Sequence, residues 1–246
     1  PPAQRPKEIL PPPTTGPNAR SPFWAVLGQP LRPGPPPGNS DIRERTTALP
    51  DNNTPVPPGI YFMDQCVGPA QCGGIFVKGA GPGAPALLNL VLTVEGGRQV
   101  IYMRHATVPS ANPAKLSGRF IILGATTSWE CFTSCTGFPS RVFTNEFNNI
   151  IYVEGDIMSS DDPQSGLYGI VHRNQRLTIA ADGEIRITDH LVYEQPPNSA
   201  SDPVPNILGL YAWCSDSGGT PCSKRDVTVV GADTPNNLFI DGAVLA

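Results

Sequence analysis

The chain has 246 residues, a formal net charge of −4 and 15% charged residues. It is long enough to bury a substantial core, and its acidic balance argues against a nucleic-acid binder that relies on bulk positive charge. The 30 prolines and 25 glycines are many for a helical or doubly wound protein. They favour a chain with many corners and an extended arm.

Proline content divides the sequence near residue 59. Residues 1–58 hold 17 of the 30 prolines and show little strand or helix periodicity, which predicts a Pro-rich extended N-terminal arm or linker. Residues 59–246 are the predicted folded domain. One apolar group interrupts the arm, and we expect it to fasten the arm to the domain; a partner-binding motif is the alternative. This group consists of Phe23, Trp24, Val26 and Leu27.

Short segments rich in β-branched and aromatic residues, separated by Gly or Pro, make up the domain. The Gly96-Gly97 pair predicts a hairpin turn, and no amphipathic helix is predicted. The predicted strands are 59–63, 74–77, 87–94, 99–103, 120–123, 150–158, 167–171, 177–180, 184–193, 207–212, 227–230 and 238–245.

A phrase in which β-branched residues flank a Gly with its acidic or small neighbour recurs along the second half. It occurs at Ile151–Ile157, Thr178–Ile187 and Leu238–Leu245, with an imperfect echo at Gly73–Gly79. Alternating apolar residues are typical of a half-buried strand, and the Gly supplies a corner. Repetition of this phrase predicts an all-β fold, a β-solenoid or β-helix-like stack of short strands.

The ordered series of these segments carries a resemblance. The segments are 149–157, 177–189, 206–212 and 238–246, with 73–79 and 90–101 upstream. Together they resemble the β-solenoid region of large type IV pilus-associated surface proteins of bacteria, the minor pilin-like proteins in which a solenoid is inserted into a pilin fold. The resemblance covers residues 59–246 and implies a place on a pilus, with pilin or other filament subunits as partners.

The chain departs from such pilins in lacking their apolar N-terminal helix and any segment beyond its last strand phrase. We therefore expect a processed chain or a fragment of a longer protein. An uncapped apolar strand at the C-terminal end predicts self-association through an open solenoid end. No apolar stretch is long enough to span a membrane.

The six cysteines form three sequence-local pairs, Cys66 with Cys72, Cys131 with Cys135, and Cys214 with Cys222. Even number and close pairing favour three short-loop disulfides and hence an oxidising, extracellular compartment. Zinc is the alternative, but no pair has a two-residue gap and none of the three histidines lies at ligand spacing from a pair. No cofactor or metal site is expected.

Catalysis by a β-helix enzyme needs carboxylates that converge on one groove. We favour turn roles for the carboxylates of this chain, because several adjoin corner glycines, where Asp is common for local hydrogen bonding. They are Asp156, Asp161, Asp162, Asp182, Glu184, Asp189 and Asp241. No catalytic residue is therefore predicted.

Basic residues gather at a few predicted corners. They are Arg104, His172, Arg173, Arg176, Lys224 and Arg225. Stacked on one side, they would form a stripe that contacts DNA phosphates or another ligand, with Tyr152, Tyr168 or Tyr193 as stacking platforms. The alternative, which the acidic net charge favours, is that they are solvated.

Together these observations predict a non-enzymatic, cell-surface or pilus-associated module with a structural or adhesive role, displayed on a filament. A DNA-receptor minor pilin for DNA uptake in natural transformation is the alternative, and a carbohydrate-active β-helix is a further one. DNA or a surface glycan is the expected ligand class. Loops that project from the stacked strands are the expected place of recognition.

Overall fold

A computed structural model describes residues 57–63, 73–80, 84–106, 116–158, 162, 164–195, 206–212 and 227–229, and the backbone of 243–245. These residues belong to one compact unit, residues 37–246. Strands and their connections make up the described ranges, which contain no helix, so the all-β prediction is confirmed. Nearly all of the predicted arm, residues 1–58, lies outside the described residues, and the arm stays a prediction.

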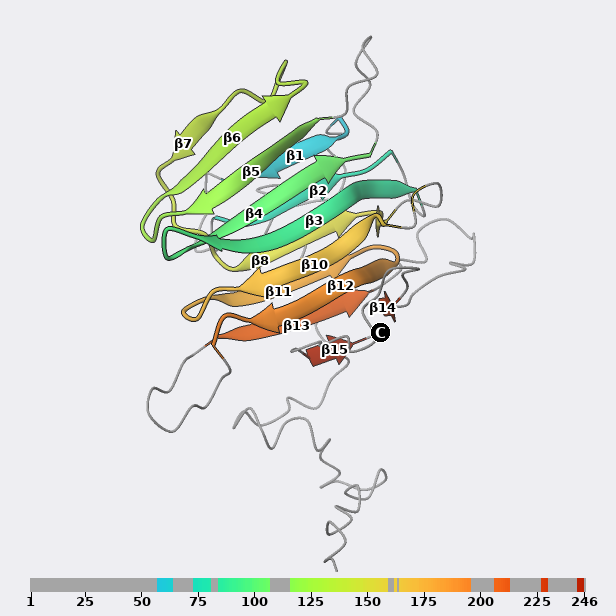
Figure 1. Cartoon of the computed structure of the whole chain (residues 1–246). Coiled ribbons are helices and arrows are strands. Elements are labelled where there is room, and N and C mark those ends of the chain that lie inside the picture. Colours follow the sequence, from blue (N-terminus) through green and yellow to red (C-terminus); the bar gives the residue numbers. More distant parts are fainter. Residues whose placement is uncertain are drawn as a thin grey trace, which may run out of the picture. The chain divides into compact units, whose positions relative to one another are not determined.

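The described strands form two sheets, which we name sheet A and sheet B. Sheet A is mostly parallel and lies behind sheet B in Figure 1; only its first two strands pair antiparallel. Its strands, in spatial order, are β1 (Gly59–Phe62), β2 (Ile75–Lys78), β8 (Ile150–Glu154), β11 (Arg176–Ala181), β13 (Ile207–Ala212) and β15 (Ala243–Leu245).

Sheet B has a parallel part and an antiparallel part that share β3 (Pro85–Glu95). The parallel part adds β9 (Asp156–Ile157), β10 (Gly166–Val171), β12 (Ile185–Tyr193) and β14 (Val227–Val229). The antiparallel part continues through β4 (Arg98–His105), β5 (Ser117–Ile122), β6 (Thr127–Thr133) and β7 (Arg141–Phe143).

Along the sequence, the parallel strands alternate between the two sheets. Strand β2 precedes β3, β8 precedes β9 and β10, β11 precedes β12, and β13 precedes β14. The antiparallel strands β4 to β7 are inserted between β3 and β8, and they extend sheet B away from the parallel part (Figure 1). The insertion makes sheet B wider than its parallel part alone.

Corner glycines take the chain from sheet A to sheet B at the recurring phrases. Gly155 adopts φ +129°, and a Cβ there would lie 2.5 Å from the carbonyl oxygen of Ala84. The side chain of Asp156 accepts the backbone N–H of Glu184 at 2.8 Å, which joins this corner to the next one. The corner phrases around Gly155 and Gly183 thus stack, while most of the third phrase lies outside the described residues.

The main core lies between the sheets. Alternate residues of the sheet A strands from β1 to β13 point into it, as Ile75 and Val77 do in β2 and Ile151 and Val153 do in β8. They pack with the inward face of sheet B and are fully buried. Each Å² of apolar surface removed from water contributes about 25 cal/mol of stabilising free energy, so the packing between the two sheets is the main stabilising interaction of the fold.

Most predicted strands correspond to observed ones, and the Gly96-Gly97 turn has positive φ at both residues, 57° and 70°, as a type I′ hairpin requires. Between residues 105 and 147 the sequence predicts one strand, 120–123, which corresponds to β5. Strands β6 and β7 in the same stretch were not predicted. Residues 230–242, with most of the last predicted strand, lie outside the described ranges.

His105 makes the fold sensitive to acid. It ends β4, is 0% exposed, and its Nε2 lies 2.6 Å from the carbonyl oxygen of Lys78. Burial lowers its pKa below the usual 6.5, against a smaller opposing effect of that hydrogen bond. In the unfolded chain the imidazole gains a proton as pH falls below 6.5, so the unfolded state binds more protons there.

We therefore expect wild-type stability to be retained above about pH 6.5 and to fall as pH drops below it. Urea unfolding at about pH 7.5 and about pH 5.5 measures the loss, and in His105→Gln the difference between the two should shrink. His190→Gln, the same substitution at a half-buried histidine, is the comparison variant. An unchanged difference in His105→Gln would contradict the assignment.

Candidate recognition surfaces

Three of the predicted basic residues lie together. His172 and Arg173 form the turn after β10, and Arg176 begins β11. His172 and Arg176 line a groove of about 390 Å³ with Arg98, which follows the tip of the β3–β4 hairpin. Arg98 was missed by the sequence analysis, although its place directly after the Gly96-Gly97 turn was a usable signal.

Gln99 holds this groove in shape. It is 1% exposed, and its Oε1 accepts the backbone N–H of His172 at 2.7 Å. Its Nε2 donates to the carbonyl oxygen of Ile170 at 3.2 Å. The hairpin tip and the β10–β11 turn are therefore tied to each other, so the basic side chains of both project from a fixed backbone.

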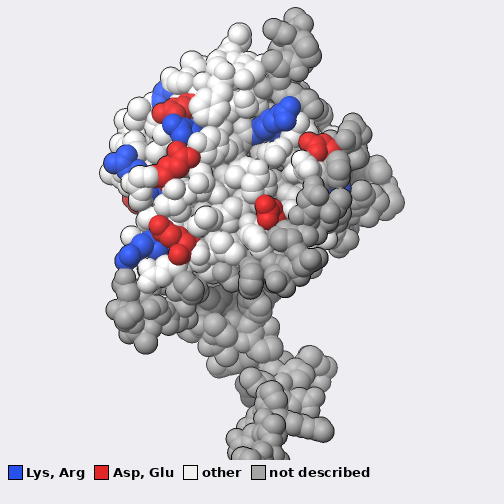
Figure 2. All heavy atoms as spheres, in the orientation of Figure 1, with Lys and Arg blue, Asp and Glu red and all other residues white. Residues whose placement is uncertain are grey.

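Acidic residues balance the charge of the groove. Glu146 forms part of its wall. The Oε2 atom of Glu194 lies 3.7 Å from Nε2 of His172 and accepts the backbone N–H of Arg173 at 3.0 Å. Figure 2 likewise shows acidic and basic side chains interspersed over the described part of the visible face. The groove suits a ligand that offers both anionic and donor groups better than a bare polyanion.

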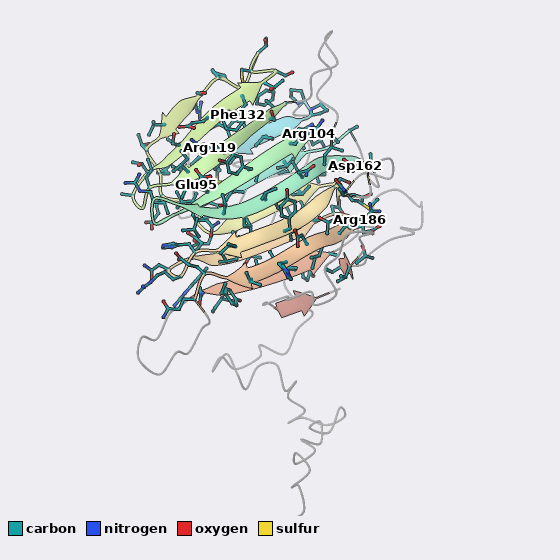
Figure 3. All side chains as sticks on the ribbon, in the orientation of Figure 1. Glu95, Arg104, Arg119, Phe132, Asp162 and Arg186 are labelled. Carbon is teal, nitrogen blue, oxygen red and sulfur yellow. A yellow bond between two sulfur atoms is a disulfide. The ribbon has the colours of Figure 1, made fainter. Side chains whose placement is uncertain are left out.

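The remaining basic predictions do not join this cluster. Arg104 is exposed near the opposite end of β4, as Figure 3 shows. Lys224 and Arg225 lie outside the described residues. Of the predicted stacking platforms, Tyr152 is 2% exposed and is unable to stack on a ligand. Tyr193 accepts the backbone N–H of Leu208 at 2.8 Å, and Tyr168 is half-buried on β10.

A second surface lies on the antiparallel part of sheet B, centred on Arg119. Its guanidinium carbon lies 5.6 Å from the ring centroid of Tyr102 and 5.9 Å from that of Phe132. Phe132 is 53% exposed. We name this surface the Arg119 patch; it comprises Glu95, Tyr102, Arg119, Glu130 and Phe132. Figure 3 shows Glu95, Arg119 and Phe132 spread over neighbouring strands of sheet B.

Hydrogen bonds fix the geometry of the Arg119 patch. Arg119 donates from Nε to Glu130 and from Nη1 to Glu95, each at 2.8 Å. The hydroxyl of Tyr102 donates to Glu95 at 2.7 Å and accepts from Arg119 at 2.9 Å. Hydrogen bonding to Glu130 raises the pKa of Arg119, and hydrogen bonding to Glu95 raises the pKa of Tyr102. Arg119 therefore stays cationic and Tyr102 stays neutral near neutral pH.

One predicted disulfide lies beside this patch. Cys131 of β6 is bonded to Cys135, with their Cα atoms 5.8 Å apart. The bond closes the turn that follows Phe132, and this pairing is confirmed. Cys66, Cys72, Cys214 and Cys222 lie outside the described residues, so their pairings stay predictions. Within the described ranges, no three His, Cys, Asp or Glu side chains are grouped to hold a metal ion.

The described carboxylates accept backbone or neighbouring polar hydrogens. Asp156 bonds the next corner as described above, Asp162 accepts the N–H of Gln164 at 3.0 Å, and Asp189 accepts that of His190 at 2.7 Å. Glu184 accepts the hydroxyl of Thr228 at 2.5 Å. The contacts of Asp162 and Asp189 are local ones, as expected of turns, whereas those of Asp156 and Glu184 join segments that are 28 and 44 residues apart in the sequence. Asp161 and Asp241 lie outside the described residues.

Comparison with known proteins finds no family model, curated protein or solved structure that matches the chain. The resemblance to pilus-associated proteins therefore stays a prediction. The described residues include no helix of the length and apolar character needed to cross a membrane. At this level the described part of the chain is an all-β structure of two sheets, with a groove lined by basic residues and an exposed aromatic and charged patch.

Proposed function

We propose that the chain is a non-catalytic, surface-displayed adhesive module whose scaffold is a β-solenoid. The alternation of parallel strands between sheets A and B supports the solenoid, as does the stacking of the corners at Gly155 and Gly183. In this arrangement each turn of chain adds one strand to sheet A and then one or two strands to sheet B. Among the described strands, β14 pairs only with β12 and β15 only with β13, and their other edges are the places where pilin subunits or further copies would join.

The Arg119 patch carries the adhesive part of the proposal. Exposed aromatic rings and an arginine, held in place by carboxylates, are the residue types that dominate recognition surfaces. The strands that present them form an insertion in the parallel course, so they add a face that the stack itself does not need. Ring faces for stacking and fixed charged groups for hydrogen bonding suit a surface glycan.

Placement on a cell surface or pilus rests on separate support. The Cys131–Cys135 disulfide favours an oxidising compartment. The resemblance of the strand phrases to pilus-associated solenoids supports placement on a filament. The extracellular location and the filament are both parts of the proposal.

An array of immobilised oligosaccharides tests the adhesive role. The wild-type chain should bind at least one glycan class, and Phe132→Ser should weaken that binding about tenfold, as loss of a recognition hot spot does. Val142→Ser is the matched control, since Val142 is 65% exposed on β7 and lies outside the patch. Absence of binding, or equal loss in both variants, would contradict the proposal.

DNA reception is the second candidate, and the convergence of Arg98, His172 and Arg176 on one groove favours it. If it is correct, fluorescent double-stranded DNA should bind the chain and be released as salt rises. Each phosphate contact contributes about −0.9 to the slope of log K against log salt. Arg98→Gln and Arg176→Gln should each reduce that slope by about one, whereas Arg104→Gln should not. Absence of binding at low salt would exclude this candidate.

A further inference from the structure

The groove that Arg98, His172 and Arg176 line lies where four segments of the chain meet. They are the tip of the β3–β4 hairpin, the end of β5 with the turn after it, residues 146–149 before β8, and the β10–β11 turn. Figure 1 shows the three turns among them at the same end of the strands, on the left. The groove volume of about 390 Å³ lies within the range of about 300–1,000 Å³ that is typical of small-molecule sites. A small ligand, or one unit of a polymer, therefore matches the groove in size.

Two arginine side chains of the groove are available to a ligand. Arg98 and Arg176 are exposed, and neither side chain makes an ion pair or a hydrogen bond with another described residue. The guanidinium of Arg119, by contrast, is held by two carboxylates. A guanidinium group presents parallel N–H donors that match the two oxygens of a carboxylate. The arginines of the groove therefore suit an anionic group, and a carboxylate above all.

Side-chain amides in the groove offer hydrogen bonds to uncharged groups. Gln175 is 7% exposed, and its Nε2 donates to Oδ1 of Asn149 and to the carbonyl oxygen of Arg176, the latter at 3.1 Å. Within the described ranges, Oε1 of Gln175 and Nδ2 of Asn149 are left without a hydrogen bond. The amide oxygen of a side chain this deeply buried is normally paired, so a free one that lines a groove indicates a binding site. One atom accepts and the other donates, which matches the hydroxyl groups of a sugar.

Glu146 and the apolar part of the wall restrict which anions fit. The carboxylate of Glu146 is exposed in the groove and has no charged or donor partner in the part of the chain that the structure describes. It repels a polyanion but is a strong acceptor for hydroxyl groups. Ile122, Leu123 and Phe147 form the apolar wall. The ring of Phe147 is 2% exposed, so it gives no platform on which a nucleic-acid base could stack.

We propose that the groove binds a carboxylate-bearing sugar unit, a uronic acid, of an acidic saccharide. Arg98 and Arg176 bind the carboxylate of the sugar. Its hydroxyl groups donate to Glu146 and to Oε1 of Gln175 and accept from Nδ2 of Asn149, while the C–H face of its ring packs on the apolar wall. The site shares no residue with the Arg119 patch, so the inference does not depend on what that patch binds.

Calorimetric titration of the full chain with a trimer of galacturonic acid tests the site. The trimer should bind, and its methyl ester, which keeps the ring hydroxyls but loses the charge, should bind at least about tenfold more weakly. Arg98→Gln and Arg176→Gln should each weaken binding of the acid trimer about tenfold. Arg104→Gln changes an exposed arginine on the same strand as Arg98 but outside the groove, and it should leave binding unchanged. Absence of binding at millimolar trimer, equal binding of the ester, or an equal loss in Arg104→Gln would overturn the proposal.

Glu146→Gln separates a saccharide site from a general anion site. Affinity for the acid trimer should fall severalfold, because an amide accepts hydroxyl groups more weakly than a carboxylate does. Affinity for double-stranded DNA should instead rise, because a negative charge is removed. Unchanged or higher affinity for the trimer in this variant would overturn the proposal, since the groove would then select charge alone. DNA that binds the wild type more tightly than the trimer, and is lost in Arg98→Gln, would assign the groove to nucleic acid.

Phe132→Ser keeps this test apart from that of the Arg119 patch. The variant removes the exposed ring of the patch and leaves the groove intact, so it should bind the acid trimer as the wild type does. Loss of trimer binding in Phe132→Ser would place the trimer at the patch and overturn the groove assignment.

Discussion

Gly169→Ala should destabilise the protein by about 4 kcal/mol, because backbone strain and overpacking each cost about 1–3 kcal/mol. Gly169 lies in β10 with φ +122°, a conformation that L side chains rarely adopt. A Cβ at this position would lie 1.9 Å from the carbonyl oxygen of Leu92 and 2.8 Å from its carbon. Both atoms belong to the backbone of the paired strand β3, so the clash cannot be relieved by a change of side-chain rotamer.

Gly124→Ala is the matched control, since Gly124 has φ +80° and open space around its Cβ position. It should cost only the backbone term, about 1–2 kcal/mol. Urea unfolding of both variants, with m-values compared to confirm the same transition, measures the difference. Equal losses would mean that β3 and β10 do not approach as closely as the structure shows.

The local phrases of the sequence predict the parallel strands well, for a physical reason. Around Gly155, apolar residues alternate on both sides of a glycine whose positive φ turns the chain, and both signals are local. The β3–β4 hairpin is predicted for the same reason, from Gly96-Gly97 alone. Neither signal depends on which distant strand becomes the neighbour.

Strand β6 escaped prediction because its apolar residues do not alternate in the sequence, although its two faces do. Thr127 and Trp129 are buried, yet Phe132, the next large apolar residue, is 53% exposed. A polar run with one exposed phenylalanine gives no period of two that points to a core. The strand is stabilised instead by pairing with β5 and by the ring of Trp129, and these are tertiary effects.

The Arg119 patch was likewise not predictable from the sequence. Its residues come from four strands, and they meet only because Tyr102 pairs with Arg119 and Arg119 with Glu130. A shift of one residue in either pairing would move Arg119 to the opposite face, and sequence alone does not specify this register. The basic groove was half predicted, because His172, Arg173 and Arg176 are close in sequence, whereas Arg98 joins them through the fold.

Phe120→Ala should destabilise the protein by about 3–5 kcal/mol, the usual cost of emptying a buried aromatic site. Phe120 is 1% exposed in β5, and its ring centroid lies 4.7 Å from that of Trp129 and 6.1 Å from that of Phe62. Trp129 belongs to sheet B and Phe62 to β1 of sheet A. Removing the ring therefore takes away one of the contacts between the inserted strands and sheet A; Phe143 of β7 makes another, with its ring centroid 4.3 Å from that of Phe62.

Phe132→Ala is the control on the neighbouring strand, because an exposed ring buries little area and its loss should cost under about 1 kcal/mol. A recess of about 120 Å³, lined in part by Phe120, Trp129 and Phe143, already borders the site, so the new cavity joins it and collapse is not expected to offset the loss. Amide hydrogen exchange adds a regional test. In Phe120→Ala, protection should fall first in β5 to β7 and β1 while β11 and β13 keep theirs, because the parallel strands do not depend on the inserted ones. Uniform loss across both sheets would instead show that the insertion and the parallel stack unfold as one unit.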